Sequence, residues 1–398
     1  EEEITSYDHR IEINDDQMTI LIPETYYPGS YKFYVKSNGI VSDPVQFEVM
    51  MPKVTSLTSG VIRRGASLLL EGEYLPVEST AYQFRHTESN RAIPVKGGSN
   101  LQNFTYLRTW GLMGKGEYQL EFKFGEEFYP TGRSITLESY FEYVNTCDVF
   151  DIYEGKGQVC FANNGKLYYL IHYEAAMRVI DIETGAVDKI RTNILEESWY
   201  NDHKVFPTIV DGKVYIHHMH QLFEFEFETH QWIQISVDNV NDSIVRTANI
   251  NHELVVTNTD NEVLKYNGAW EKIGQAKFDY FTFGIGDYYY TGFNKGFSKV
   301  SLSDFSNSVF IDSPLGRWDT YYSYRHLFVY KEELYEALNL NSILEIARFS
   351  PTKGTFSKLD PSFISSSNYY SRFFKDVNGD VFYLVNNEIY RFVADEKF

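Results

Sequence analysis

Residues 164–168 read Asn-Gly-Lys-Leu-Tyr, and residues 211–215 repeat the phrase as Asp-Gly-Lys-Val-Tyr. A polar turn followed by alternating apolar and aromatic residues is typical of a β-hairpin. Related phrases stand at residues 251–255, 285–289, 331–335 and 378–382. The apolar residue after each turn is at position 167, 214, 254, 288, 334 or 381, so neighbouring copies are 34 to 47 residues apart. Short strands that repeat at this period predict the blades of a β-propeller.

A second phrase, consisting of a strand, a turn and often an aromatic residue, follows most of these hairpins. The copies are residues 179–185, 225–232, 264–270 and 347–356. This phrase resembles the third strand of the kelch repeat, although no copy is preceded by the Gly-Gly pair of that family. The resemblance implies a six-bladed kelch-like β-propeller, related in fold to galactose oxidase, over residues 146–398.

The last predicted blade lacks an outermost strand, because residues 381–384 and 388–392 are followed only by six residues. An unpaired sheet edge is unfavourable. We therefore expect the segment near residues 147–153 to supply that strand and to close the ring. Cys147 and Cys160 flank this segment and are the chain's two cysteines. Both a disulfide and a pair of thiols are compatible with the sequence.

The N-terminal part has a different pattern of sequence motifs. Gly-Ser-Tyr-Lys-Phe at residues 29–33 is matched by Gly-Glu-Tyr-Gln-Leu at residues 116–120, and Arg-Gly-Ala-Ser-Leu-Leu-Leu stands at residues 64–70. These stretches resemble IPT/TIG domains, which are immunoglobulin-like β-sandwiches. The resemblance implies one domain over residues 1–51, without its first strands, and a second over residues 52–145. The predicted fold class is therefore all-β.

Composition supports this class and excludes several functions. Phe, Tyr and Trp make up 17% of the 398 residues, and these side chains favour strands. Acidic residues number 55 and basic residues 36, which gives a formal charge of −19. Such an excess disfavours nucleic acid and anionic membrane surfaces as partners. No apolar run is long enough to span a bilayer. Because the first residue is Glu, we expect that an N-terminal segment has been removed.

The signatures of nucleotide, hydrolase and zinc-protease sites do not occur in the sequence. His217, His218 and His220 form its densest group of metal-binding side chains. On a strand, His218 and His220 would share one face. Two ligands are too few to define a metal site. We therefore predict no catalytic residues, no metal and no cofactor.

Aromatic and polar residues gather in the long loops that lead into the predicted blades. In a four-stranded blade these loops lie at the same end as the turn that joins the second and third strands. Aromatic faces stack on sugars, and forked polar groups bind hydroxyls. The alternative is that these side chains pack the loops onto the sheets. The candidate ligand-binding residues are Trp199, Tyr200, His203, His218, His220, Arg317, Trp318, Tyr321, Tyr322, Arg325, Tyr369 and Tyr370.

The whole architecture resembles cell-surface proteins of Bacteroidetes-type bacteria. The resemblance implies a location on the outer face of the outer membrane or in the medium, with a lipid anchor upstream of residue 1 as one way of attachment. The leading hypothesis is a non-enzymatic protein that binds glycans, with the sandwiches as a stalk. The second is a scaffold for a surface protein partner. The third is a carbohydrate-active enzyme, an epimerase, oxidase or lyase, that uses His203, His220, Tyr322 and Arg325.

Overall fold

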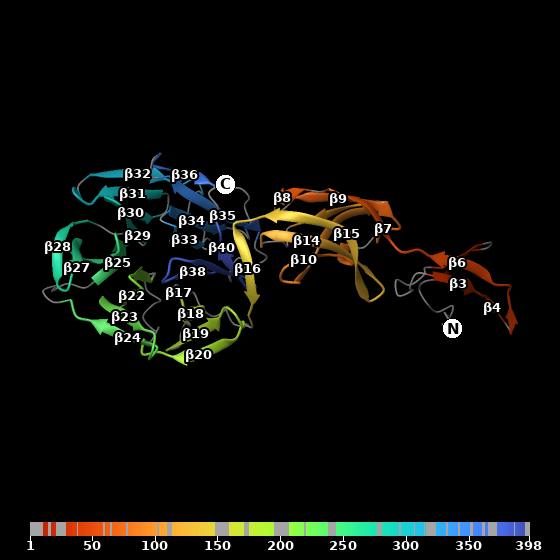
Figure 1. The fold of residues 1–398 in the computed structure, drawn as a ribbon, viewed down its shortest axis with the longest axis horizontal. Coiled ribbons are helices and arrows are strands. Elements are labelled where there is room, and N and C mark those ends of the chain that lie inside the picture. Colours follow the sequence, from red (N-terminus) through yellow and green to blue (C-terminus); the bar gives the residue numbers. More distant parts are fainter. Residues whose placement is uncertain are drawn as a thin grey trace. The chain divides into compact units, whose positions relative to one another are not determined.

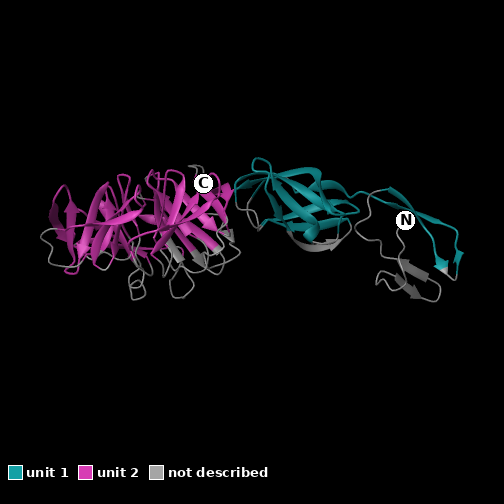
Figure 2. Cartoon of the chain, turned by 90° about the horizontal axis from the view of Figure 1, so that it is seen from below, with its two compact units in different colours: residues 1–138 teal, residues 139–398 magenta. Residues whose placement is uncertain are grey.

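The computed structural model divides the chain into two compact units, residues 1–138 and residues 139–398 (Figure 2). The described residues are 11–14, 17–20, 29–37, 39–58, 60–63, 66–76, 79–101, 103–109, 114–147, 159–170, 175–194, 207–218, 220–237, 244–276, 281–293, 296–305, 307–313, 315, 324–331, 333–340, 343–350, 353–359, 363–364, 372–385 and 387–394. Throughout these ranges the regular structure is strand, apart from a short 3-10 turn at Ser79–Ala81. The predicted all-β class is confirmed.

The first part of unit 1 consists of two-stranded ladders. They are β1 (Ile11–Asn14) with β2 (Gln17–Ile20), β3 (Gly29–Phe33) with β6 (Val45–Val49), and β4 (Lys36–Ser37) with β5 (Ile40–Val41). The apolar side chains of Ile40 and Val45 are 76% and 64% exposed. The β3–β6 ladder is held by its backbone pairing and by Tyr31 stacking on Phe47.

The remainder of unit 1 has two sheets that share one hydrophobic core. The first has the order β11-β10-β14-β15-β8, and the second has the order β12-β13-β9-β7. The strands are β7 (Lys53–Leu57), β8 (Val61–Arg63), β9 (Ser67–Glu73), β10 (Tyr82–His86), β11 (Ala92–Pro94), β12 (Lys96–Leu101), β13 (Phe104–Arg108), β14 (Gly116–Phe124) and β15 (Glu127–Glu138). Alternation places Leu68 and Leu70 of β9 opposite Tyr82 and Phe84 of β10 in that core.

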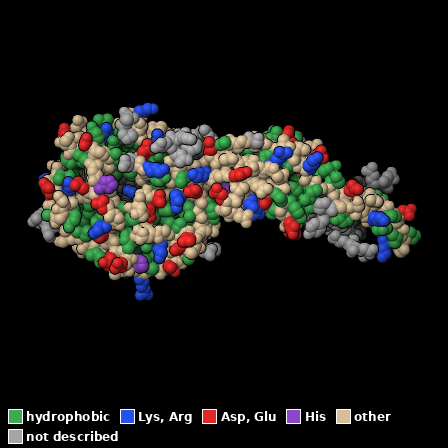
Figure 3. Space-filling view, in the orientation of Figure 1, with side chains coloured by type: hydrophobic (Ala, Val, Ile, Leu, Met, Phe, Trp, Pro, Cys, Tyr) green, Lys and Arg blue, Asp and Glu red, His purple; other side chains and the backbone are tan. Residues whose placement is uncertain are grey.

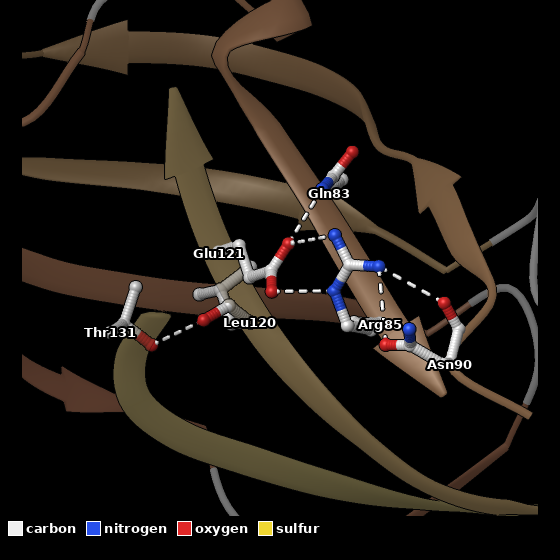
Figure 4. Close-up of polar contacts among 6 residues, drawn as sticks. All are labelled: Gln83, Arg85, Asn90, Leu120, Glu121 and Thr131. Carbon is white, nitrogen blue, oxygen red and sulfur yellow. Dashed lines mark hydrogen bonds and ion pairs between the residues drawn. The ribbon is translucent and has the colours of Figure 1, made fainter. Parts of the chain in front are cut away.

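A polar network covers the other face of β10 and β14 (Figure 4). Arg85 donates from Nε and Nη2 to the two carboxylate oxygens of Glu121, at 2.7 and 3.0 Å. Gln83 donates to the same carboxylate at 2.5 Å, and Arg85 Nη1 donates to the backbone oxygen of Asn90 at 3.0 Å. On the neighbouring turn, Thr131 donates to the backbone oxygen of Leu120. Through Gln83 and Arg85 the network joins β10 and the β10–β11 turn to one buried carboxylate on β14.

Unit 2 is built from antiparallel meanders of consecutive strands (Figure 1). Five of them, counted over the described ranges, have four strands in sequence order. They are β17 (Cys160–Asn163), β18 (Lys166–Leu170), β19 (Ala176–Asp181) and β20 (Val187–Arg191); β21 (Thr208–Val210), β22 (Lys213–His218), β23 (Gln221–Glu226) and β24 (Gln231–Ile235); β25 (Ile244–Ile250), β26 (Glu253–Asn258), β27 (Glu262–Tyr266) and β28 (Trp270–Gln275); β29 (Phe281–Ile285), β30 (Tyr288–Phe293), β31 (Gly296–Ser301) and β32 (Ser308–Asp312); and β33 (Tyr324–Tyr330), β34 (Glu333–Leu340), β35 (Ile343–Ser350) and β36 (Thr355–Lys358), with β37 (Phe363–Ile364) beside β35. The arrangement is consistent with a β-propeller-like structure.

The last meander is completed by a strand from the start of the unit. β38 (Arg372–Asp376), β39 (Val381–Val385) and β40 (Glu388–Phe392) are followed in the sheet by β16 (Phe141–Thr146), which pairs with β40. We expected the strand near residues 147–153 to hold this edge and placed residues 141–145 in the preceding domain. The structure differs, because Phe141 pairs with Phe392 and buries its ring among Phe373, Tyr383 and Tyr390. Residues 148–153 lie outside the described residues.

The hairpins quoted at the outset are present. Asn164 and Asp211 both have φ of 46°, followed by Gly165 and Gly212 at 72° and 77°, between the first two strands of their meanders. Positive φ at both central residues is the geometry of the tight hairpin turn, which explains the Asn-Gly and Asp-Gly pairs. Aromatic side chains pack within and between the meanders. The ring centroid of Phe161 on β17 lies 5.1 Å from that of Tyr168 on β18 and 5.1 Å from that of Phe225 in the next sheet.

Candidate functional site

The candidate site lies at one end of the unit 2 sheets. We name the strands of each meander a to d in sheet order, a being the first. The starts of strands a and c and the end of strand b lie together in an antiparallel meander, and we call this the b–c end. Strands a of neighbouring meanders run in the same direction where they pair, β17 with β38 and β25 with β29. Their b–c ends therefore coincide.

The histidine group lies at the b–c end of β22. His217 and His218 are the last residues of the strand and are only 6% and 8% exposed. The ring of His218 lies 6.2 Å from that of Phe223, and burial lowers the pKa of His218 below its ordinary value. His220 has φ of 65° and lies in the turn, exposed. The strand thus ends before His220, so the expected pairing of His218 and His220 on one strand face does not occur.

His217 connects β22 to the next meander. Its Nε2 lies 3.3 Å from Nη1 of Arg246 on β25. A guanidinium can only donate, so Nε2 accepts and the imidazole proton resides on Nδ1. Next to this contact, the hydroxyl of Thr208 on β21 lies 2.8 Å from the hydroxyl of Thr247 on β25. Polar side chains therefore replace apolar ones where these two sheets reach the b–c end.

A second polar group lies where the first and last meanders meet. Cys160, Tyr169 and Arg178 are directly opposite one another on β17, β18 and β19, so their side chains share one face. Arg372 on β38 is close enough that its charge acts on both the Cys160 thiol and the Tyr169 hydroxyl. Burial raises the pKa of Cys160 to about 12. We call Cys160, Tyr169, Arg178 and Arg372 the seam cluster.

The Tyr169 hydroxyl is a buried polar atom of the seam cluster. The residue is 8% exposed, and its hydroxyl has no hydrogen-bond partner among the described residues. Burial raises the pKa of this hydroxyl, an effect that the charges of Arg178 and Arg372 oppose. The hydroxyl is therefore protonated at neutral pH and available as a donor.

Most of the residues predicted from the sequence cannot be placed. Of the twelve candidates, His218 and His220 have described side chains, and Arg325 is described only as a position on β33. The others lie outside the described residues: Trp199, Tyr200, His203, Arg317, Trp318, Tyr321, Tyr322, Tyr369 and Tyr370. The role of these residues in binding remains a prediction.

Sequence reasoning missed Arg246, Arg372 and Tyr169. Each lies inside a strand, whereas the candidates were sought in loops. The sequence signal was weak, because Arg246 stands five residues before the hairpin phrase at 251–255, whereas Arg372 stands six residues before the phrase at 378–382.

Metal binding and membrane insertion find no further support in the described part of the chain. Those residues contain no group of three or more His, Cys, Asp or Glu side chains suited to hold a metal ion. None of their helical segments has the length and apolar character needed to cross a bilayer.

No family model matches the chain, and no curated protein sequence matches it. Among solved structures, an auxiliary nutrient-binding protein of Bacteroides thetaiotaomicron is similar with a TM-score of 0.45 and 10% identity, covering 85% of this chain and 97% of that one. Another, from Bacteroides ovatus, has a TM-score of 0.41 and 12% identity over 87% and 99% of the chains. A putative phosphatase of Bacteroides thetaiotaomicron has a TM-score of 0.40 and 11% identity over 87% and 98%. Similarities this distant assign neither a ligand nor an activity.

Proposed function

We propose that the chain is a non-enzymatic binding protein that recognises glycans at the b–c end of unit 2. The observation that carries the proposal is the gathering of guanidinium, imidazole and phenol groups at that end, in the seam cluster and around His217 and Arg246. Guanidinium forks donate paired hydrogen bonds to sugar oxygens, and aromatic rings stack on the C–H faces of sugars.

The proposal includes a finer description of the fold. Unit 2 is a six-bladed kelch-like β-propeller, with β16 as the outermost strand of its last blade. Residues 1–51 and residues 52–145, without the strand β16 that joins unit 2, are IPT/TIG-like domains that act as a stalk. The consecutive four-stranded meanders support the first assignment, and the two sheets around one core support the second.

In this proposal the aromatic loop residues extend the binding surface, with Trp199 and Trp318 as its stacking platforms. In the proposal the protein acts at the surface of a bacterial cell or in the medium, and a lipid anchor upstream of residue 1 is one way of attachment to the cell. Nutrient binding is also the role named for two of the similar structures, but the argument for this chain rests on its own residues.

A glycan array tests the proposal with the wild type and the Trp199→Ala, Trp318→Ala double variant. We expect binding to one glycan class in the wild type and its loss in the double variant. Tyr266→Ala is the control, since Tyr266 is 43% exposed at the other end of its sheet, at the turn between strands c and d. Binding that survives the double variant would remove the two tryptophans from the site. No binding to any glycan would reject the proposal.

A role as a protein scaffold is the second candidate, because one edge strand exposes apolar side chains. Val309 and Phe310 on β32 are 59% and 56% exposed, and β32 is strand d of its meander. Exposed apolar edges are sites at which another chain can add a strand. Cross-linking on intact cells, with Val309→Lys as the comparison, would recover a partner that the variant fails to recover.

A further inference from the structure

The chain contains four Asn-Gly pairs, and three of them have well-described but different surroundings. The pairs stand at residues 38–39, 164–165, 267–268 and 378–379. Asn38 lies outside the described residues, so the comparison concerns the other three pairs. All three lie in hairpin turns of unit 2. The pairs at 164–165 and 378–379 join strands a and b, whereas the pair at 267–268 joins strands c and d.

An asparagine that precedes glycine is open to spontaneous deamidation. The backbone nitrogen of the glycine attacks Cγ of the asparagine side chain, the bond from Cγ to the side-chain nitrogen breaks, and ammonia leaves with the proton of the glycine N–H. Water then opens the cyclic succinimide at one of its two carbonyls, which gives aspartate or isoaspartate. Glycine favours the attack because it has no Cβ and rotates freely. The rate in a folded chain therefore depends on how the turn holds the glycine nitrogen.

The turn at residues 378–379 holds its glycine nitrogen in place. The N–H of Gly379, which would be the nucleophile, donates to the backbone oxygen of Asp376 at 3.0 Å. The N–H of Asn378 donates to Oδ1 of Asp376 at 2.7 Å. Attack on the Asn378 side chain would first have to break the Gly379 hydrogen bond, which the fold opposes.

The turn at residues 164–165 is constrained by its geometry. It has only two residues, because Asn163 and Lys166 are paired, and Asn164 has φ of 46°. The backbone oxygen of Gly165 accepts from the N–H of Ile182 at 2.8 Å. Bringing Cγ of Asn164 onto the Gly165 nitrogen requires rotation about the Cα–C bond of Asn164. That rotation would disturb both the tight turn and the bond to Ile182.

The turn at residues 267–269 leaves its glycine nitrogen open. Tyr266 pairs with Trp270, so the loop has three residues, and all three are exposed. The N–H of Asn267 donates to the backbone oxygen of Ala269 at 3.0 Å, whereas the N–H of Gly268 donates to no acceptor among the described residues. A Cβ built on Gly268 would meet nothing within 4 Å. Neither a hydrogen bond nor a neighbouring atom of the described chain therefore restrains the attacking group.

We propose that Asn267 is a site of spontaneous deamidation in the folded protein, and that the turns at Asn164 and Asn378 protect those residues. Isoaspartate at position 267 would add one methylene to the backbone between the paired residues Tyr266 and Trp270. Trp270 joins β28 to the preceding meander, since its Nε1 donates to the backbone oxygen of Ser236 at 3.3 Å. The modification would therefore loosen the outermost strand of its meander and this contact.

Deamidation also changes the charge of the protein. The chain carries a formal charge of −19, and acidic and basic side chains are interspersed over the face shown in Figure 3. A new carboxylate in an exposed turn is ionised at neutral pH and adds one negative charge. The deamidated protein should therefore elute later from an anion-exchange column, which separates it from the unmodified protein.

Ageing the full chain at mildly alkaline pH, followed by mass mapping of its peptides, tests the proposal. We expect Asn267 to deamidate at least about fivefold faster than Asn378, which corresponds to the hydrogen bond that must break before Gly379 can attack. Asn164 should also be slower than Asn267. In guanidinium chloride the turns are lost, so the three rates should converge.

Variants separate the chemistry from the fold. Gly268→Ala should slow the reaction at Asn267 several-fold, because a Cβ hinders the attack. The matched control is Gly212→Ala, since Gly212 and Gly268 have φ of 77° and 74° and open space around the added Cβ. This control should leave the rate at Asn267 unchanged. Asn267→Gln should remove the mass change from its peptide, because glutamine must close a larger ring. Thermal unfolding checks that each variant is folded.

Three results would overturn the proposal. The first is no deamidation at Asn267 in the aged, folded chain. The second is deamidation of Asn164 or Asn378 in the folded chain as fast as that of Asn267. The third is the same order of rates in guanidinium chloride, because neighbouring residues in the sequence, rather than the turns, would then set the rates.

Discussion

Glu121 illustrates how a single carboxylate is kept ionised inside a sheet. Its side chain is 8% exposed, and burial alone would raise its pKa, but hydrogen bonds from Arg85 and Gln83 hold that pKa below its ordinary value. The pair is a bidentate one of the stronger kind. Removing the carboxylate would leave the Arg85 guanidinium facing a partly buried gap.

We expect Glu121→Ala to destabilise unit 1 by about 1–3 kcal/mol in urea unfolding, because Arg85 and Gln83 lose their acceptor. Glu126→Ala is the control, since its contact with Lys123 is 3.6 Å long and exposed, and should change stability by less than about 0.5 kcal/mol. Equal effects of the two substitutions would show that the Arg85–Glu121 pair stabilises the unit no more than an exposed ion pair does.

The lowered pKa of Glu121 also fixes the direction of a pH effect. A carboxyl whose pKa is lower in the folded chain binds protons more readily when unfolded, so its contribution to stability is complete above the unfolded pKa and is lost as the pH falls through the folded one. Below about pH 4.5 the wild type should therefore lose stability faster than Glu121→Gln. Parallel stability curves for the two proteins from pH 7 to pH 3 would contradict this.

Cys147 and Cys160 are thiols that should resist modification. They are 5% and 7% exposed in one hydrophobic cluster, and burial raises the pKa of Cys160 to about 12. Only the thiolate reacts. We expect neither cysteine to react with a thiol reagent at pH 8 until denaturant is added, when both should react. Rapid reaction of either thiol in the folded chain would show that the seam between the first and last sheets opens.

At the residue scale, the turn residues could be predicted from the sequence, whereas Arg246 and Arg372 could not. Asn164 and Asp211 could be predicted because a two-residue hairpin requires positive φ from the residues themselves. Arg372 and Tyr169 could not, because their significance arises only when β18 and β38, some two hundred residues apart, are brought together.

Among the elements, β16 connects the start of unit 2 to its end. It adds the fourth strand to the sheet of β38, β39 and β40 and reaches the neighbouring meander through Asn145, whose amide donates to the backbone oxygens of Ile182 and Glu183. From the sequence we predicted that a strand near the start of unit 2 would complete this sheet, but we assigned that role to the segment near residues 147–153. Residues 141–144 and 148–153 have similar alternation, so only the tertiary pairing distinguishes them.

Gly185 provides a test of this contact. Gly185 and Gly212 have nearly the same φ, 73° and 77°, but a Cβ on Gly185 would lie 2.1 Å from the backbone oxygen of Thr146 at the end of β16, whereas one on Gly212 meets nothing within 4 Å. We expect Gly212→Ala to cost about 1 kcal/mol, from strain at positive φ, and Gly185→Ala to cost more than about 3 kcal/mol. Similar costs in chemical unfolding would argue against a close approach of β16 to this turn.

For the whole molecule, separate hydrophobic cores predict separate unfolding. The buried residues of unit 1 form one cluster, and those of unit 2 form a different set. Domains with their own cores fold as units. The change in sequence motifs indicated this division, with a boundary near residue 145. The boundary in the structure is at residue 138, because the last strand before the repeats, β16, belongs to the second unit.

Differential scanning calorimetry should therefore show two transitions. Phe141→Ala should lower only the unit 2 transition, by the equivalent of about 3–5 kcal/mol, because the Phe141 ring is fully buried among aromatic side chains. Glu121→Ala should lower only the other. A single transition that both substitutions shift would mean that the two units unfold together.

The pairing of β16 with β40 has a consequence for synthesis of the chain on the ribosome. Cys147, directly after β16, donates its backbone N–H to Asn387, directly before β40, and these residues are 240 positions apart. At roughly 5–20 residues per second, β16 emerges some 10 to 50 seconds before its partner exists. During that time an early strand waits with an open edge, and the intervening sheets can form without it. The last sheet of unit 2 is therefore completed only after β40 has been synthesised, and a nascent chain stalled before β40 would leave β16 without its partner strand.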